Sequence, residues 1–265
     1  MQTISSLPLS DRPVSTMTGD KARLISLDLY TGSRESLLRA IMQAARRRES
    51  RGVCFANVPL VVAAQRDPAV AAAVNRVDWI TADGVPLTWA MRALYGIRPE
   101  RIAGMAATDT LLRLAAQQQI PVFFYGSTPE VHQRTWQLCR VMYPTLSIVG
   151  MVAPPFRPAT PAEDEAIIAD ITASGAGLVF VSLGCPEKER WIARMQDRIP
   201  AVLLGVGGAL PVLAGYRARA PRLIQQAGLE WLFRLVQAPS RLGRRYAFTN
   251  PLFGYYLLRQ WLSGR

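Results

Sequence analysis

Short apolar stretches rich in β-forming residues alternate with amphipathic stretches of helical period along most of this 265-residue chain. The candidate strands span residues 22–29, 52–57, 79–81, 122–125, 147–149, 178–183 and 201–206. Strands that alternate with helices usually pair in parallel, because each helix carries the chain back along the sheet. We therefore predict an α/β fold: a mainly parallel, Rossmann-like sheet flanked by helices on both faces.

Capping residues and prolines mark the starts of four predicted helices. These starts are Ser33 before residues 34–48, Asp67-Pro68 before 69–75, Ser127-Thr128-Pro129 before 131–142, and Thr160-Pro161 before 164–173. A side-chain oxygen at the cap accepts a backbone N–H of the first turn, and proline fits that turn without strain. The pattern thus supports the alternation of strands and helices.

The pattern changes after Gly215, where helical segments follow one another without strands. We predict a disordered leader at residues 1–20, an α/β core at 21–215 and a helical, basic and aromatic C-terminal appendage at 216–265. The leader is polar and lacks the basic-then-apolar pattern of an export signal. The longest apolar run, residues 201–216, is interrupted by four glycines and a proline and is shorter than the roughly 18 to 20 residues of a spanning helix. We expect a protein that is either soluble or bound to a membrane surface without crossing it.

Positive charge is concentrated in the appendage. Residues 217–265 hold nine arginines, eight aromatic residues and a single acidic residue, Glu230, and so supply eight of the twelve net positive charges. Arginine attracts phosphate, and Trp and Tyr favour boundaries between apolar and aqueous surroundings. An anionic membrane surface or a lipid-linked diphosphate offers both features, and the phosphates of a nucleic acid attract the same charge.

Glycine or polar residues follow five of the predicted strands. They are Asn57, Asp83-Gly84, Gly126-Ser127, Gly184 to Glu189, and Gly207-Gly208. Ligands of open α/β sheets gather at the carboxyl ends of the strands, and glycine there exposes backbone amides to phosphate. Any one of these glycines is more simply explained by a tight turn, but the set predicts a phosphate-bearing ligand.

Motifs for the common cofactors are missing. The stretch Gly205 to Leu210 has leucine where a dinucleotide fingerprint needs a small residue, and no GxxxxGK[ST] occurs. The three cysteines, Cys54, Cys139 and Cys185, are far apart in the sequence, which predicts neither a zinc site nor a disulfide framework and favours a reducing cytoplasm. We expect no cofactor and no metal.

A carboxylate is the better candidate for acid–base chemistry. The only histidine, His132, is predicted on the surface of a helix. Asp83 ends a short strand and precedes a predicted helix at 87–95, so that its side chain either faces the ligand cleft or caps the helix. Glu187 and Glu189, which flank Lys188 near a helix start, are explained equally well as solvated helix residues.

A longer series of motifs runs in order from about Val53 to Tyr246. It consists of Asn57, Ala82-Asp83-Gly84-Val85-Pro86, Arg101-Ile102-Ala103-Gly104, Phe124-Tyr125-Gly126-Ser127, Gly184-Cys185-Pro186 with Glu189 and Trp191, Gly205-Val206-Gly207-Gly208, Ala214-Gly215, Arg219-Ala220-Pro221, Gly228-Leu229-Glu230-Trp231, Arg234-Leu235, Pro239-Ser240-Arg241 and Arg244-Arg245-Tyr246. This series resembles the WecG/TagA/CpsF glycosyltransferases, glycosyltransferase family 26. The ordered set is far more specific than any of its members.

The resemblance implies an inverting, metal-independent transfer of a sugar from a nucleotide-diphosphate donor to a sugar linked through diphosphate to a polyprenyl lipid. It implies that Asp83 is the general base and that an appendage rich in arginine completes the active site at the cytoplasmic face of the inner membrane. The substrate-binding candidates are Asn57, Gly126, Ser127, Gly184, Lys188, Glu189, Gly207, Gly208, Arg217, Arg219 and Arg222. The membrane-docking candidates are Arg241, Arg244, Arg245, Tyr246 and Trp261.

Some residues depart from the family pattern. They are Phe55 in place of threonine, Lys188 in place of glutamine, Leu210-Pro211 in place of Phe-Asp, and Ala106 in place of an aspartate, with Asp109 as the candidate for a shifted substitute. These departures point away from N-acetylated sugars and favour the xanthan-type branch, in which glucose is added β-1,4 during exopolysaccharide biosynthesis. The alternative within the family is transfer of N-acetylmannosamine or its uronic acid.

The sequence alone is also compatible with two other classes of protein. A pI near 10 with aromatics among arginines is also typical of nucleic-acid-binding proteins, although no known nucleic-acid motif occurs and the charge lies behind an α/β domain. A membrane-surface scaffold without activity is the second. We favour the enzyme, expect no nucleic-acid partner, and leave a homo-oligomer open.

Overall fold

A computed structural model describes residues 21–221, 223–224 and 229–263, without the side chain of Arg241. The predicted leader, residues 1–20, lies outside the described residues. The strands are β1 Lys21–Leu24, β2 Leu27–Tyr30, β3 Arg51–Ala56, β4 Trp79–Ala82, β5 Val122–Gly126, β6 Ile148–Val152, β7 Leu178–Ser182 and β8 Val202–Gly205. The helices are α1 Arg34–Arg46, α2 Val58–Arg66, α3 Pro68–Asn75, α4 Val85–Tyr95, α5 Gly104–Gln118, α6 Pro129–Met142, α7 Pro161–Ser174, α8 Glu187–Met195, α9 Ala209–Leu213, α11 Glu230–Gln237 and α12 Pro239–Leu262.

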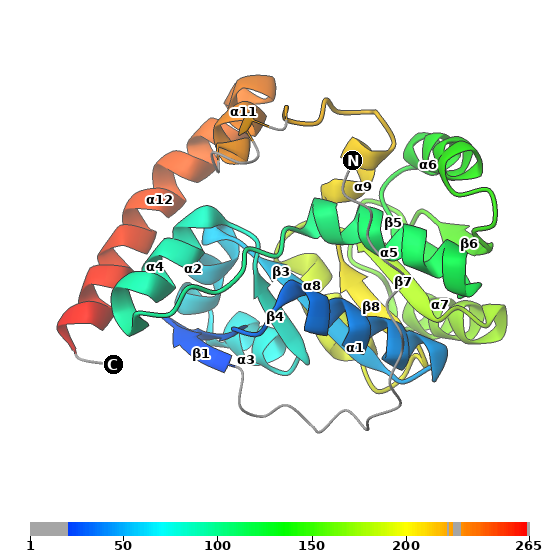
Figure 1. The fold of residues 1–265 in the computed structure, drawn as a ribbon, viewed down its shortest axis with the longest axis horizontal. Coiled ribbons are helices and arrows are strands. Elements are labelled where there is room, and N and C mark those ends of the chain that lie inside the picture. The colour runs from blue at the N-terminus through cyan, green and yellow to red at the C-terminus, as the bar shows by residue number, and fades with distance from the viewer. Residues whose placement is uncertain (1–20, 222, 225–228, 264–265) are drawn as a thin grey trace.

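Strands β3 to β8 form one six-stranded sheet with the order β4-β3-β8-β7-β5-β6 (Figure 1). Every pairing within this sheet is parallel, so all six carboxyl ends lie at the same edge. The predicted α/β class with a parallel sheet is confirmed.

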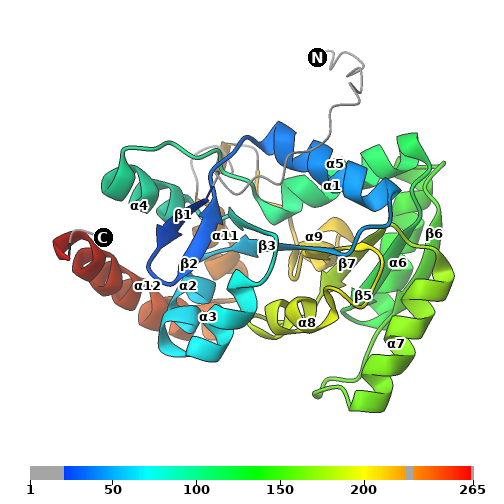
Figure 2. The same cartoon turned by 90° about the horizontal axis from the view of Figure 1, so that it is seen from below.

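Helices cover both faces of the sheet (Figure 2). Alternate residues of each strand point to opposite faces, and on β5 Phe124 joins one core cluster while Phe123 and Tyr125 join the other. Helices α1, α5, α6 and α9 pack on the first face. Helices α2, α3, α4, α7 and α8 pack on the second.

The predicted helix starts are confirmed at atomic detail. Ser33, Asp67, Thr128 and Thr160 each accept a hydrogen bond from a backbone N–H in the first turn of α1, α3, α6 and α7. At α7 the side chain of Glu163 also accepts from the backbone N–H of Thr160, which completes a capping box.

The prediction of one continuous strand over residues 22–29 is wrong. Two short strands, β1 and β2, form an antiparallel hairpin outside the main sheet, and Ile25 turns the chain with a φ of 57°. A β-branched residue rarely adopts that conformation, so the local sequence favours a continuous strand. The hairpin is held beside β4, and Asn75 donates to the carbonyl of Ser26 and accepts from the N–H of Asp28.

The C-terminal appendage packs on the core through α12, the long helix at one side of Figure 1. Its inner face lies against α2, and Leu242, Thr249 and Phe253 are buried there. Near its end, Gln260 accepts from the backbone N–H of Ile25 and donates to the carbonyl of Arg23. Among the described residues, no helix combines the length and the apolar character needed to cross a membrane.

Candidate active site

The carboxyl edge of the sheet gathers all five predicted strand ends. After β3 the chain passes to α2 on one face, whereas after the neighbouring β8 it passes to α9 on the other. Ligands of open α/β sheets bind at the carboxyl ends of strands whose following segments diverge in this way. Strands β7 and β8 diverge likewise, since α8 follows β7 on the same face as α2. We use the name β3/β8 crevice for the ligand position expected at the carboxyl ends of β3 and β8.

Asp83 and Asn57 lie side by side at one end of this crevice. The backbone N–H groups of Asp83 and Gly84 both donate to the carbonyl of Ala56, at 2.9 and 3.3 Å. Gly84 also approaches Asn57 closely, since a Cβ on Gly84 would lie 3.7 Å from the Asn57 Cα. The two predicted polar residues are brought together by adjacent strands.

The side chains of Asp83 and Asn57 differ in what they do locally. Gly84, not Asp83, is the N-cap of α4, and no side chain caps that helix, so the capping explanation for Asp83 is wrong. Asn57 does cap α2, because its Oδ1 accepts from the backbone N–H of Leu60 at 3.2 Å. The Asp83 carboxylate is thereby left available to a ligand.

Charged groups from three other segments surround the Asp83 carboxylate. They are Arg101 before α5, Lys188 on α8, and Glu230 and Arg234 on α11. Removal from water raises the pKa of Asp83 above its ordinary value; Arg234 and Arg101 oppose this rise and Glu230 adds to it. A carboxyl with a raised pKa accepts a proton more readily, which suits a general base.

Two tight turns hold the ends of β5, β7 and β8 together. Gly126 has a φ of 98°, and a Cβ there would lie 2.6 Å from the carbonyl oxygen of Ser182, so only glycine fits. The N–H of Ser127 donates to that same oxygen at 2.9 Å. The Ser182 hydroxyl in turn donates to the carbonyl of Gly207 at 2.8 Å, which fixes the glycine loop after β8.

Gly184 and Gly208 face open space, since a Cβ at either position would meet no described atom within 4 Å. Their backbone is accessible to a ligand at the crevice. Both positions therefore have the exposure that contact with a phosphate needs.

Lys188 and Glu189 form a buried ion pair beneath the glycine loop. Their side chains are 7% and 0% exposed, so the sequence-based explanation of Glu189 as a solvated helix residue is wrong. The Lys188 stem lies under Gly207, whose added Cβ would be 3.3 Å from the Lys188 Cδ. Burial is the largest influence on the pKa of Lys188 and would lower it, but the Glu189 carboxylate together with Cys185 and Cys54 raises the pKa above its ordinary value, so the ammonium stays charged.

The appendage brings arginines to the same edge. Arg219 lines a small pocket together with residues of α5, α9 and α11, namely Met105, Val212, Ala218, Ala220, Glu230, Phe233 and Arg234. Arg217 is exposed beside it. Arg222 lies outside the described residues. Of the three predicted diphosphate arginines, the structure therefore places Arg219 at a pocket shared with α11.

The membrane-docking candidates lie along α12. Arg244 and Arg245 are exposed, Tyr246 is half-buried, and Trp261 is 59% exposed. Arg245 stacks over the Tyr246 ring at 5.7 Å and also opposes the burial that raises the pKa of Cys185 to about 11. The Arg245 charge therefore reaches Cys185, two residues before the start of α8.

The structure places two further polar residues, His132 and Asp109. His132 is 6% exposed, so its predicted surface placement is wrong: it lies with Val131 and Thr135 on the inner face of α6, and burial lowers its pKa. Asp109 on α5 accepts a 2.7 Å hydrogen bond from the hydroxyl of Tyr143, the residue that follows α6. Its role as a shifted substitute stays a prediction.

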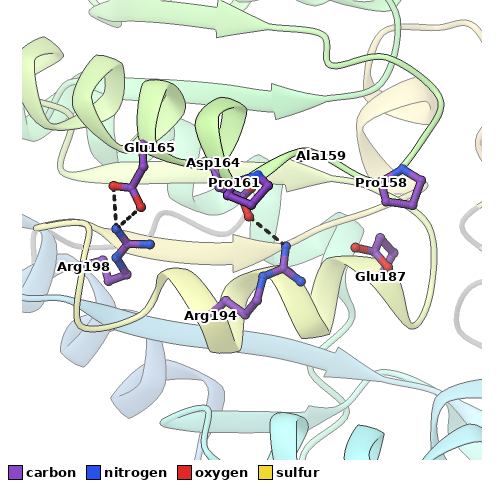
Figure 3. Close-up of a pocket in the computed structure, with 8 residues that line it drawn as sticks. All are labelled: Pro158, Ala159, Pro161, Asp164, Glu165, Glu187, Arg194 and Arg198. Atoms are coloured by element: carbon purple, nitrogen blue, oxygen red, sulfur yellow. Dashed lines mark hydrogen bonds and ion pairs between the residues drawn. The ribbon is translucent and has the colours of Figure 1, made fainter.

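A separate pocket of about 320 Å³ lies between α7 and α8 (Figure 3). Four of its charged side chains pair with each other across it, Arg194 with Asp164 at 3.4 Å and Arg198 with Glu165 at 2.7 Å. Glu187, one of the predicted strand-end residues, lines it, but none of the substrate-binding candidates does. Because its arginines are already paired with carboxylates, this pocket carries no argument for the phosphate-bearing ligand.

Three residues at the site were absent from the sequence-based candidates: Arg101, Glu230 and Arg234. They come from distant segments, as in the 2.7 Å ion pair between Arg101 and Glu230, which are 129 positions apart. All three belong to the motif series of the sequence, and Glu230 is also the only carboxylate among nine arginines in residues 217–265. Among the described residues, no group of three His, Cys, Asp or Glu side chains is placed to hold a metal.

A parallel α/β sheet whose carboxyl edge combines one carboxylate, several cations and exposed glycine amides defines an enzyme that transfers a group from a phosphate-bearing donor. The family model of the WecG/TagA/CpsF glycosyl transferases matches residues 22–265, so the chain belongs to that family. The match confirms the resemblance and extends it beyond residues 53–246 in both directions. The protein is a glycosyltransferase, and its family implies a nucleotide-sugar donor and an acceptor.

Proposed function

We propose that this enzyme transfers glucose, with inversion and in β-1,4 linkage, from a UDP-sugar to a polyprenyl-diphosphate-linked sugar in exopolysaccharide biosynthesis. The observation that carries the proposal is the Asp83 carboxylate at the mouth of the β3/β8 crevice, with a raised pKa and cations from three segments around it. A carboxylate that accepts protons readily suits deprotonation of an acceptor hydroxyl. The cations suit a diphosphate.

The reaction follows from this arrangement. Asp83 takes the proton of the acceptor hydroxyl while the oxygen attacks the anomeric carbon opposite the departing nucleotide diphosphate, which inverts the centre. Arg219 and Arg234, together with the exposed backbone amide of Gly208, stabilise the charge that grows on the leaving diphosphate. Lys188 adds a buried positive charge beneath the glycine loop.

The choice of sugar rests on fewer residues. Phe55, one of the departures from the family pattern, is buried at 3% exposure, and its ring packs under Gly104. It therefore acts on the sugar only through the backbone that holds Asn57. The remaining departures support glucose, and transfer of N-acetylmannosamine or its uronic acid is the alternative.

A panel of donors and acceptors tests the proposal. We expect the purified enzyme to add one hexose from UDP-glucose to a short-chain prenyl diphosphate glucose, with a β-1,4 linkage in the product. Product masses and linkage analysis are the measurements. Addition of an N-acetylated sugar would support the alternative within the family. Failure with every UDP- and GDP-sugar would contradict the proposed donor class.

We further propose that the appendage docks on an anionic membrane at the cytoplasmic face of the inner membrane. The supporting observation is that large apolar and basic side chains of α11 and α12 stay exposed. The exposed apolar residues are Trp231, Leu232, Val236, Phe248, Tyr255, Leu258, Trp261 and Leu262. Aromatic rings among arginines match the interface between lipid headgroups and acyl chains.

Replacement of Trp261 by serine should weaken binding to anionic vesicles on the order of tenfold, equivalent to about 1.4 kcal/mol, because the ring leaves water when it inserts. Vesicle co-sedimentation measures this. The matched control is Trp136→Ser, since Trp136 is 46% exposed on α6. Equal losses in the two variants, or none in Trp261→Ser, would contradict the docking role of α12.

A further inference from the structure

The guanidinium of Arg101 connects the Asp83 loop to the appendage. Its Nε donates to the backbone carbonyl of Asp83 at 2.6 Å, and its Nη2 donates to Glu230 Oε2 at 2.7 Å. The same Nη2 lies 3.9 Å from Asp83 Oδ1, at the outer limit of an ion pair. One side chain thus reaches both the carboxylate proposed as the base and the first residue of α11.

The backbone next to Arg101 is anchored to the sheet. The N–H of Ile102 donates to the carbonyl of Ala82 at 3.1 Å, and the Thr81 hydroxyl donates to the carbonyl of Ile102 at 3.2 Å. These bonds hold the start of the Arg101 side chain beside β4. The guanidinium can therefore move only a short distance from its anchored backbone. The carboxylates within its reach are those of Asp83 and Glu230.

The two carboxylates compete unequally for Arg101. Charge-assisted hydrogen bonds are strong near 2.7 Å, and the Glu230 contact has that length while the Asp83 contact is 1.2 Å longer. Both ion pairs are partly shielded, with side-chain exposures of 24% for Arg101 and 19% for Glu230. The docked appendage therefore holds Arg101 away from full pairing with Asp83.

We propose that Arg101 is a positioning residue through which docking of α11 frees the Asp83 carboxylate: Glu230 holds the guanidinium that otherwise pairs with Asp83. This inference rests on the proposed function of Asp83 as the base. It links the appendage, which carries the membrane-docking surface, to the reaction centre by one shared arginine.

The sign of the effect follows from the charges that face Asp83. These are Arg101, Glu230, Arg234 and Lys188. Loss of the Glu230 charge removes a neighbour that raises the pKa of Asp83 and lets Arg101 close on the carboxylate, which lowers that pKa further. Asp83 then becomes a weaker base that stays ionised to lower pH.

The pH dependence of kcat/KM for Glu230→Gln tests the coupling. We expect the acid limb to move to lower pH by on the order of one unit, and the plateau to fall about tenfold. The control is Glu165→Gln, which breaks the 2.7 Å ion pair between Glu165 on α7 and Arg198, a residue after the end of α8, and should change neither value. A uniform loss at every pH with an unmoved acid limb overturns the proposal, because that is the result of weakened docking alone.

A second measurement needs no substrate. Hydrogen–deuterium exchange of α11 should be at least about tenfold faster in Glu230→Gln and in Arg101→Lys than in the wild type, since lysine keeps the charge but lacks the fork that reaches two partners. Unchanged exchange in both variants overturns the docking contact. If the wild-type enzyme transfers no sugar, the proposed function fails, while the exchange result still decides whether Arg101 holds the appendage.

Discussion

The Asp83→Asn enzyme is expected to lose about 10²- to 10⁴-fold in kcat/KM, the usual contribution of a general base. Asparagine keeps the shape of the side chain but cannot take a proton from the acceptor hydroxyl. Binding of the nucleotide-sugar donor should persist, because the arginines and the glycine loop are untouched. Steady-state kinetics with the active donor–acceptor pair measure the loss.

The fold should tolerate this change. Asp83 caps no helix, and its backbone bonds to Ala56 and Arg101 survive the substitution. An acid whose pKa is raised by folding destabilises the native state once the pH exceeds its unfolded pKa. At neutral pH, removal of the Asp83 charge should therefore leave the melting temperature equal to that of the wild type or higher.

The wild-type pH profile gives an independent check. Because the pKa of Asp83 is raised, activity should fall on acidification at a pH above the ordinary aspartate value of about 3.9. Asp67→Asn is the matched control, since asparagine caps α3 as well as aspartate does. Full activity of Asp83→Asn would rule out its role as the base.

The parallel sheet and the gathering of its strand ends were predictable because they depend on local pattern. Periodicity and capping residues specify where strands and helices begin, and parallel pairing then brings Asn57, Asp83 and the glycine turns to one edge. The hairpin at β1 and β2 was not predictable, since its turn at Ile25 uses a conformation that the residue disfavours. Contacts with α3 and α12 hold that turn in place.

The burial of polar side chains on α8 and α6 could not be predicted from the sequence either. The charged run Glu187-Lys188-Glu189 resembles a solvated first turn, yet the helix packs its Lys188 and Glu189 side under the glycine loop. The burial of His132 was missed for a similar reason, because a single polar residue gives no indication of which face of its helix meets the sheet. The contact between Arg101 and Glu230 depends on how the appendage docks, which no local pattern records.

A second large effect, on stability, is expected when the buried ion pair of Lys188 and Glu189 is broken. Lys188→Met should lower the free energy of unfolding by about 3 to 5 kcal/mol, because it leaves a fully buried carboxylate without its partner. Chemical denaturation measures this value. The double variant Lys188→Met with Glu189→Leu should recover most of the loss, since an apolar pair of similar volume removes both buried charges together. A single variant as stable as the wild type would contradict the ion pair.

The double variant also separates the two roles of Lys188. If the ammonium serves only to neutralise Glu189, the refolded double variant keeps the donor KM of the wild type. If the charge beneath Gly207 also attracts the donor diphosphate, stability returns while the donor KM stays raised about tenfold, the weakening expected from one lost phosphate-directed charge. We expect the second result, because the Lys188 stem lies directly under Gly207, next to the exposed Gly208. Exchange of Arg198 for methionine is the control that should leave the donor KM unchanged, because Arg198 follows α8 and pairs with Glu165 on α7.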